Sequence, residues 1–130
     1  MALRGAIPVR FEVVFPYGAY LASEVSPVME FVDGKPTSQK RHEESGDLLW
    51  EVAVIDGDPS VKIADKTIKV KIAAKYQPVP PDPMPGSPFT PVEFTDMSAK
   101  AYVSTSSSGF SRVAWSLSAR EMVSTAGAAA

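Results

Sequence analysis

The segment that decides the fold is residues 66–75, which read KTIKVKIAAK. Apolar side chains at positions 68, 70, 72 and 74 alternate with the lysines Lys69, Lys71 and Lys75. Successive side chains of a β-strand point to opposite faces of a sheet. The pattern therefore predicts a strand over 66–75, with one face in a core and a row of lysines on the other.

Four further segments show a strand pattern, at 19–32, 48–56, 91–103 and 112–122. The first is interrupted by Pro27, where we expect a bulge or a bend. Between the third and fourth segments lies a proline-rich stretch, 77–88, which can form neither a helix nor a central strand. It is predicted to be an extended connector.

Five strands, with a long bent first strand and a long third connection, predict a mostly β protein. The expected fold is a small five-stranded Greek-key barrel similar to the OB-fold. A two-sheet β-sandwich is the alternative, because periodicity alone does not distinguish the two. We expect one domain over 1–123, with 124–130 as a flexible or short helical tail.

The composition is that of an ordinary globular domain, with 130 residues of which 45% are hydrophobic and 22% are charged. The sequence has no cysteine, which excludes a disulfide framework, a thiolate metal site and a cysteine nucleophile. We expect a reducing, cytoplasmic compartment. No apolar run approaches the roughly 20 residues of a membrane helix, so no membrane association is expected.

Residues suited to catalysis are scarce. His42 is the only histidine, and its polar neighbours predict an exposed loop rather than a zinc site or a catalytic triad. Asp56 and Asp58 belong to an Asp-Gly-Asp-Pro stretch, which is typical of a turn. We therefore expect no enzymatic activity, no cofactor and no metal, and a function in binding.

Charge is distributed unevenly, although the net charge is only −2. Acidic residues dominate 11–59, whereas lysines dominate 60–81 and no acid occurs over 98–120. Cations beside exposed aromatic rings are the combination that binds single-stranded nucleic acid. The candidate nucleic-acid-binding residues are Lys69, Lys71, Lys75, Lys100, Tyr102, Phe110, Arg112, Lys40 and Arg41.

Simpler interpretations apply to the lysine row and to the two tryptophans. Lysines along one strand also protect a sheet edge from aggregation, which is the alternative for the row at 69–75. Trp50 and Trp115 alternate in phase with valine and leucine neighbours, which predicts that both lie in the core.

Several segments resemble a known family. They are GAIPV at 5–9, FPYGAY at 15–20, LLWEVAVID at 48–56, KVKIAA at 69–74 before QPVPP at 77–81, and GSPF at 86–89 before PVEF at 91–94. Together they resemble the actinobacterial plasmid replication, integration and excision activator family. The resemblance implies an accessory replication protein of a conjugative plasmid or an integrative element.

The order of strand, aspartate turn, basic strand and proline-rich connector is also similar to small proteins of other integrative conjugative elements. By analogy with them, we expect this chain to bind single-stranded DNA and to assist rolling-circle replication or a helicase. The alternative is a protein-interaction adaptor or a transcriptional activator that contacts the replication initiator. A structural component of a phage or virion is a third hypothesis.

Overall fold

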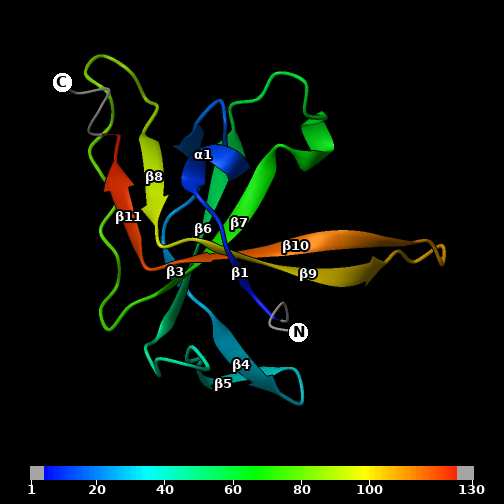
Figure 1. Cartoon of the computed structure of the whole chain (residues 1–130). Helices are drawn as coiled ribbons and strands as arrows, with labels where there is room; N and C mark the ends of the chain where they lie inside the picture. The colour runs from blue at the N-terminus through cyan, green and yellow to red at the C-terminus, as the bar shows by residue number, and fades with distance from the viewer. Residues whose placement is uncertain (1–4, 126–130) are drawn as a thin grey trace.

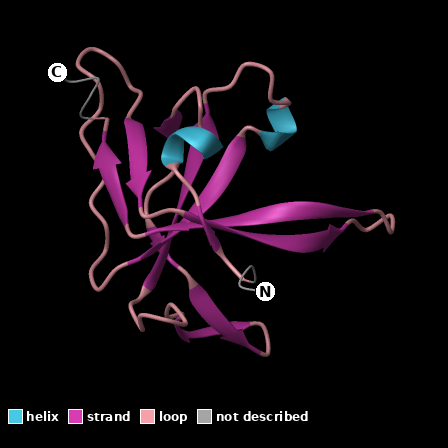
Figure 2. Cartoon of the chain, viewed as in Figure 1, coloured by secondary structure: helices cyan, strands magenta, loops and turns pink. Residues whose placement is uncertain are grey.

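The computed structural model describes residues 5–125 and is dominated by β-strands (Figures 1 and 2). The described residues contain two short helices, α1 (Phe11–Val14) and the 3-10 helix η1 (Ile63–Asp65). The strands are β1 (Ile7–Pro8), β2 (Ala19–Leu21), β3 (Ser26–Pro27), β4 (Met29–Val32), β5 (Lys35–Gln39), β6 (Leu49–Asp56), β7 (Thr67–Ala73), β8 (Pro91–Thr95), β9 (Ser98–Thr105), β10 (Ser111–Ala119) and β11 (Glu121–Ser124).

The strands pair in a circuit that makes a curled, partly open barrel. β2 pairs with β6, and β6 pairs with β7, in both cases antiparallel. β7 pairs in parallel with β10, while β10 and its continuation β11 pair with β9 and β8. β8 returns to β2. The predicted mostly β class and small barrel-like architecture are confirmed, and β4 and β5 form a second, two-stranded sheet.

The predicted fourth and fifth strands are the two arms of one long hairpin. A single register runs from Val92 opposite Ser124 to Thr105 opposite Ser111. The hairpin bends at Asp96, which has a φ of 50°. Its inner half, β8 and β11, closes the barrel, and the outer part of β9 and β10 projects away from the barrel (Figure 1). We call residues 100–116 of this projection the outer hairpin.

The core fills the concave side of the barrel. The residues that are almost completely buried include Val52 and Val54 of β6, Val70 and Ile72 of β7, and Phe15, which directly follows α1. The alternation in 66–75 therefore assigned the inward and outward faces of β7 correctly.

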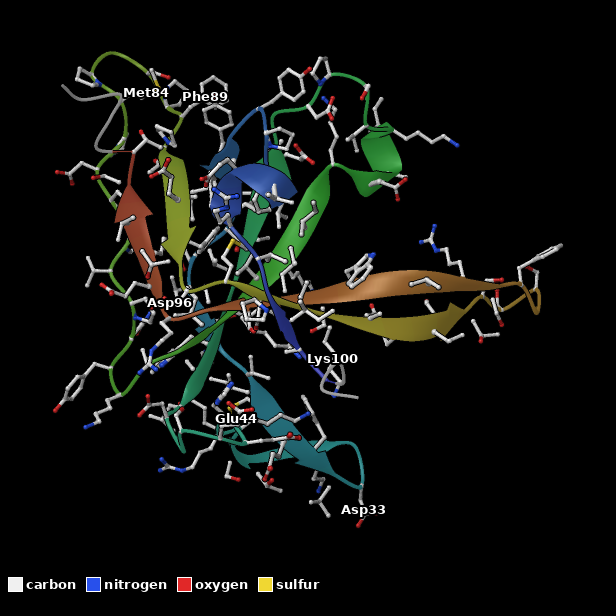
Figure 3. The ribbon with its side chains drawn as sticks, in the orientation of Figure 1. Asp33, Glu44, Met84, Phe89, Asp96 and Lys100 are labelled. Carbon is white, nitrogen blue, oxygen red and sulfur yellow. The ribbon has the colours of Figure 1, made fainter. Side chains whose placement is uncertain are left out.

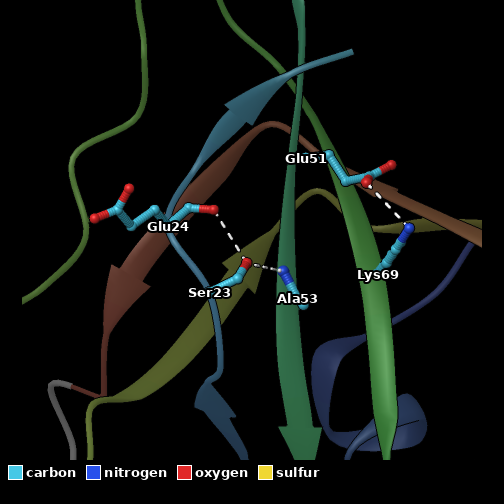
Figure 4. Close-up of polar contacts among 5 residues, drawn as sticks. All are labelled: Ser23, Glu24, Glu51, Ala53 and Lys69. Atoms are coloured by element: carbon cyan, nitrogen blue, oxygen red, sulfur yellow. Dashed lines mark hydrogen bonds and ion pairs between the residues drawn. The ribbon is translucent and has the colours of Figure 1, made fainter.

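The predicted first strand, 19–32, is divided into β2, β3 and β4, and its main break precedes the expected one at Pro27. Between β2 and β3, the Ser23 hydroxyl accepts a hydrogen bond from the Ala53 amide at 2.9 Å and donates to the Glu24 carbonyl at 3.0 Å (Figure 4). The hydroxyl takes the place of a ladder acceptor opposite β6, so the strand can break there. Pro27 itself lies in β3, opposite Trp50.

The two tryptophans have different environments, and the prediction was wrong for one of them. Trp50 is half-buried against the core, and its Nε1 donates a hydrogen bond to the Ala74 carbonyl at 3.0 Å. Trp115 is 57% exposed. By alternation, Trp115 lies on the side of β10 that faces the core within the barrel. The outer hairpin extends beyond the barrel, however, so no core residues cover that side at Trp115.

Two further predicted segments are the proline-rich connector and the C-terminal tail. The proline-rich connector 77–88 contains no strand or helix. The predicted tail, 124–130, begins at the last residue of β11, and 126–130 lie outside the described residues. Within 5–125, no helix is long and apolar enough to span a membrane.

Candidate functional site

A groove of about 730 Å³ lies between β7 and the outer hairpin. Most of the residues that line it come from β6, β7, β9 and β10, and the other two come from η1. They are Glu51, Ala64, Asp65, Thr67, Ile68, Lys69, Lys71, Lys100, Tyr102, Arg112, Trp115, Ser116 and Leu117. We call this the basic groove.

The groove forms because β7 and β10 separate. Their parallel pairing covers only 117–119 of β10, and the strands diverge before Leu117. Ser118 lies opposite Lys71, which puts the outward faces of the two strands side by side. The outward face thus continues from the barrel onto the outer hairpin.

Cross-strand register brings the hairpin residues onto that same face. Lys100 lies opposite Ser116, Tyr102 opposite Ala114, and Arg112 opposite Ser104. These positions share the phase of Ser118 and Lys71, because side chains alternate along each strand. Figure 3 shows Lys100 near the base of the projection. Five predicted residues, Lys69, Lys71, Lys100, Tyr102 and Arg112, therefore line one groove.

Four cations and two acids line the groove. The Lys69 Nζ lies 3.6 Å from the Glu51 Oε1, and Glu51 is directly opposite Lys71 in the β6–β7 register (Figure 4). Glu51 is therefore paired with Lys69 and is the cross-strand neighbour of Lys71. The Lys69 side chain is 72% exposed, and an ion pair this exposed contributes little to stability. Its main effect is to reduce the positive potential of the groove.

Three exposed aromatic rings lie along the outer hairpin. Tyr102 and Trp115 line the groove, and Phe110 lies at the hairpin tip in an adjoining hollow that it shares with Arg112. The tip is closed by a hydrogen bond from the Ser106 amide to the Phe110 carbonyl at 2.8 Å. Tyr102 and Trp115 thus lie on strands, and Phe110 lies in the short turn that joins them.

Besides Phe110 in the adjoining hollow, three of the predicted residues lie outside the groove. β7 ends at Ala73, so Lys75 falls in the connector after the strand, where it is exposed. Lys40 and Arg41 follow β5, and the Arg41 Nη1 donates to the Gly46 carbonyl at 3.0 Å. This hairpin of β4 and β5 ends at the acidic turn residue Asp33 (Figure 3).

Of the groove residues that were not predicted, Glu51 and Trp115 bear most directly on binding. Glu51 was seen only as one acid among many, because the β6–β7 register was unknown. Trp115 was placed in the core on its phase alone. The available signal for Trp115 was the serine-rich stretch 104–108, which is too polar to cover a core and implies that the adjoining strands leave the barrel.

A second hollow, of about 650 Å³, lies between α1 and β8. Its charged lining residues are Arg10 with the acids Glu12, Glu93 and Asp96. This excess of negative charge makes it a poor site for a polyanion.

The aspartates of the 56–59 turn have the capping role that their sequence indicated. The Asp56 Oδ1 accepts the Asp58 amide at 2.9 Å. The Asp58 Oδ1 accepts the Ser60 hydroxyl at 2.7 Å and the Ser60 amide at 2.9 Å. These two hydrogen bonds, the hydroxyl first, lower the pKa of Asp58, and Lys66 contributes in the same direction. Within 5–125, no cluster of three or more histidines and acids is arranged to hold a metal ion.

Comparisons of this chain with protein-family models, with curated proteins and with solved structures give no match. A function for the chain is therefore proposed from its own residues, their geometry and the resemblance described above.

Proposed function

We propose that this protein binds single-stranded DNA along the basic groove. The observation that carries the proposal is the convergence of Lys69, Lys71, Lys100 and Arg112 with the exposed ring of Tyr102 on one outward face. These side chains come from β7 and from the hairpin of β9 and β10, which are distant in the sequence, and the β7–β10 pairing brings them together.

The chemistry of the groove suits a single strand better than a duplex. Lysine and arginine neutralise phosphates and release counterions, which drives binding of any nucleic acid. Exposed rings add base stacking, worth about 1–3 kcal/mol per base, only where the bases are unpaired. Tyr102 lines the groove itself, and Phe110 extends the path towards the hairpin tip.

The proposed biological role is that of an accessory replication protein of a conjugative plasmid or integrative element. Binding of the displaced strand would assist rolling-circle replication or a helicase. This part of the proposal is supported by the sequence resemblance, and the groove supplies a chemical reason for it. An overall charge of −2 restricts any DNA contact to a local surface such as this groove.

The test is a fluorescence titration of a labelled single-stranded oligonucleotide at several salt concentrations. We expect the logarithm of the binding constant to fall linearly with the logarithm of salt, by about 0.7 for each phosphate contact. The double substitution Lys69→Glu with Lys71→Glu should weaken binding by at least tenfold and flatten that slope.

The matched control is Lys40→Glu with Lys75→Glu, which makes the same change of charge outside the groove. Equal losses in both double variants would mean that net charge, not the groove, governs binding. Competition with duplex DNA and with single-stranded RNA measures the preference for the proposed ligand. If the wild-type protein binds no oligonucleotide, the proposal fails and the adaptor hypothesis is favoured.

A further inference from the structure

The outer hairpin has a second face, opposite Lys100, Tyr102 and Arg112, that is apolar up to the Thr105–Ser111 pair near the tip. Its Trp115 also borders the basic groove. Val113 lies opposite Val103, and Trp115 lies opposite Ala101. Ile7 of β1 extends the same face at the base of the hairpin, because it lies opposite Ala99. We call Ile7, Ala101, Val103, Val113 and Trp115 the apolar face. All five are exposed, Val103 by 70% and Val113 by 65%.

The apolar face is large, and few neighbouring strands support the hairpin that carries it. Its exposed area is on the order of 500 Å², near the upper end of what monomeric proteins expose. Among the described residues, β7 supports β10 only at 117–119, and β1 supports β9 only at 98–99. A two-stranded ribbon is only marginally stable in water unless its apolar side is packed against something. The structure thus leaves a face that requires a cover.

We infer that the apolar face of one molecule is covered by the same face of a second copy of this chain. The first reason is composition, because no member of the face carries a charge. Interfaces between copies of one chain are more apolar than those between different proteins, which are about as polar as ordinary surface. An uncharged face is also complementary to itself.

The second reason is geometry. A two-fold axis can cross the hairpin between the Val103–Val113 pair and the Ala101–Trp115 pair. Rotation about this axis stacks Trp115 of one copy on Val113 of the other, and it does so twice. The two hairpins then run antiparallel, so the barrels lie at opposite ends of the contact.

The area sets the strength of the contact. Two such faces bury on the order of 1,000 Å² in total, the lower limit for a specific interface. The dimer is therefore weak and depends on protein concentration. Lys100, Tyr102 and Arg112 point away from it, on the opposite side of the hairpin. The inference does not require that the groove bind DNA.

The experiment is analytical ultracentrifugation of the protein alone, from micromolar to millimolar concentration. We expect the average mass to rise from monomer towards dimer. The Trp115 fluorescence should shift to shorter wavelength over the same range, because dimerisation removes the ring from water. Val113→Glu should stay monomeric throughout, since it places a carboxylate against Trp115 of the other copy.

The matched control is Val32→Glu, the same change at a 59% exposed position of β4. It should dimerise like the wild type. Because a glutamate in the hairpin can disturb folding, Val103→Thr with Val113→Thr provides a second test that retains β-branched side chains. This variant should dimerise at least several-fold more weakly. A wild-type protein that remains monomeric at millimolar concentration, or valine variants that dimerise normally, would overturn the inference.

Discussion

The ammonium group of Lys69 lies 3.6 Å from the carboxylate of Glu51, so the basic groove contains an anion that competes with any phosphate for this lysine. Any phosphate that contacts Lys69 must displace this carboxylate or share the lysine with it. The ion pair therefore bears on binding more than on stability, because an exposed pair contributes at most about 1 kcal/mol.

Glu51→Gln should tighten the binding of single-stranded DNA by several-fold. The amide removes the negative charge, retains the size of the side chain and leaves Lys69 available to a phosphate, so the salt slope should steepen by up to about 0.7. Titrations of both proteins at matched salt measure the two effects. The control is Glu121→Gln on β11, which lies outside the groove and should change neither. Identical affinities of Glu51→Gln and wild type would mean that Lys69 does not contact the DNA.

Truncation of the two tryptophans should lower the stability of the protein to very different extents. Trp50→Ala should lower the free energy of unfolding by about 3 kcal/mol, because it removes packing against the core and leaves the Ala74 carbonyl without its indole donor. Trp115→Ala should cost less than about 1 kcal/mol in the monomer. Urea denaturation at low micromolar concentration separates the two. A loss of 3 kcal/mol for Trp115→Ala would place that ring in a core after all.

Gly57→Ala should destabilise the barrel by about 1–3 kcal/mol. A Cβ at this position would lie 2.5 Å from the Tyr17 carbonyl oxygen, so the backbone of one of the two turns must move. The move would strain the hydrogen bond from the Gly57 amide to the Gly18 carbonyl. Thermal melting checks the cost. Gly86→Asn is a suitable comparison, because it has open space and a positive φ that asparagine tolerates. It should have the smaller effect.

The carboxyl group of Asp58 should titrate below the ordinary aspartate pKa. The Ser60 hydroxyl and amide favour its ionised form. A folded-state pKa below the unfolded value gives stability that is present above the unfolded pKa and is lost as the pH falls through the folded pKa. Ser60→Ala should raise the Asp58 pKa and weaken the pH dependence of melting in the acid range. Side-chain NMR titration measures the pKa, and an unchanged value in Ser60→Ala would assign the shift to Lys66 or to the backbone amide.

Periodicity located the barrel strands because those strands have a core on one side only. The alternation of Val70 and Ile72 with Lys69 and Lys71 assigned both faces of β7 correctly. The same logic failed for Trp115, since phase reports which face a side chain occupies and not whether a core lies behind that face. Periodicity also extended the predicted lysine row to Lys75, which lies two residues beyond the end of β7.

Register was the information that the sequence did not contain. The position of Glu51 opposite Lys71 depends on how β6 pairs with β7, and the convergence of Lys71 with Arg112 depends on a parallel pairing between distant strands. The Ser23 hydroxyl, which replaces a strand acceptor, likewise acts through a contact 30 residues away along the chain. Composition identified most of the candidate groove residues, and only the fold determined which of them meet.

The unbroken register of the long hairpin makes its reach adjustable. Every pair from Val92–Ser124 to Thr105–Ser111 follows one alignment, through the bend at Asp96. Adding or removing residues at the tip, two in each arm, would lengthen or shorten the ribbon by whole pleats and leave the barrel seam intact. A single inserted residue in one arm would instead exchange its cationic and apolar sides beyond that point. The span of the outer hairpin can therefore vary without any change in the barrel that supports it.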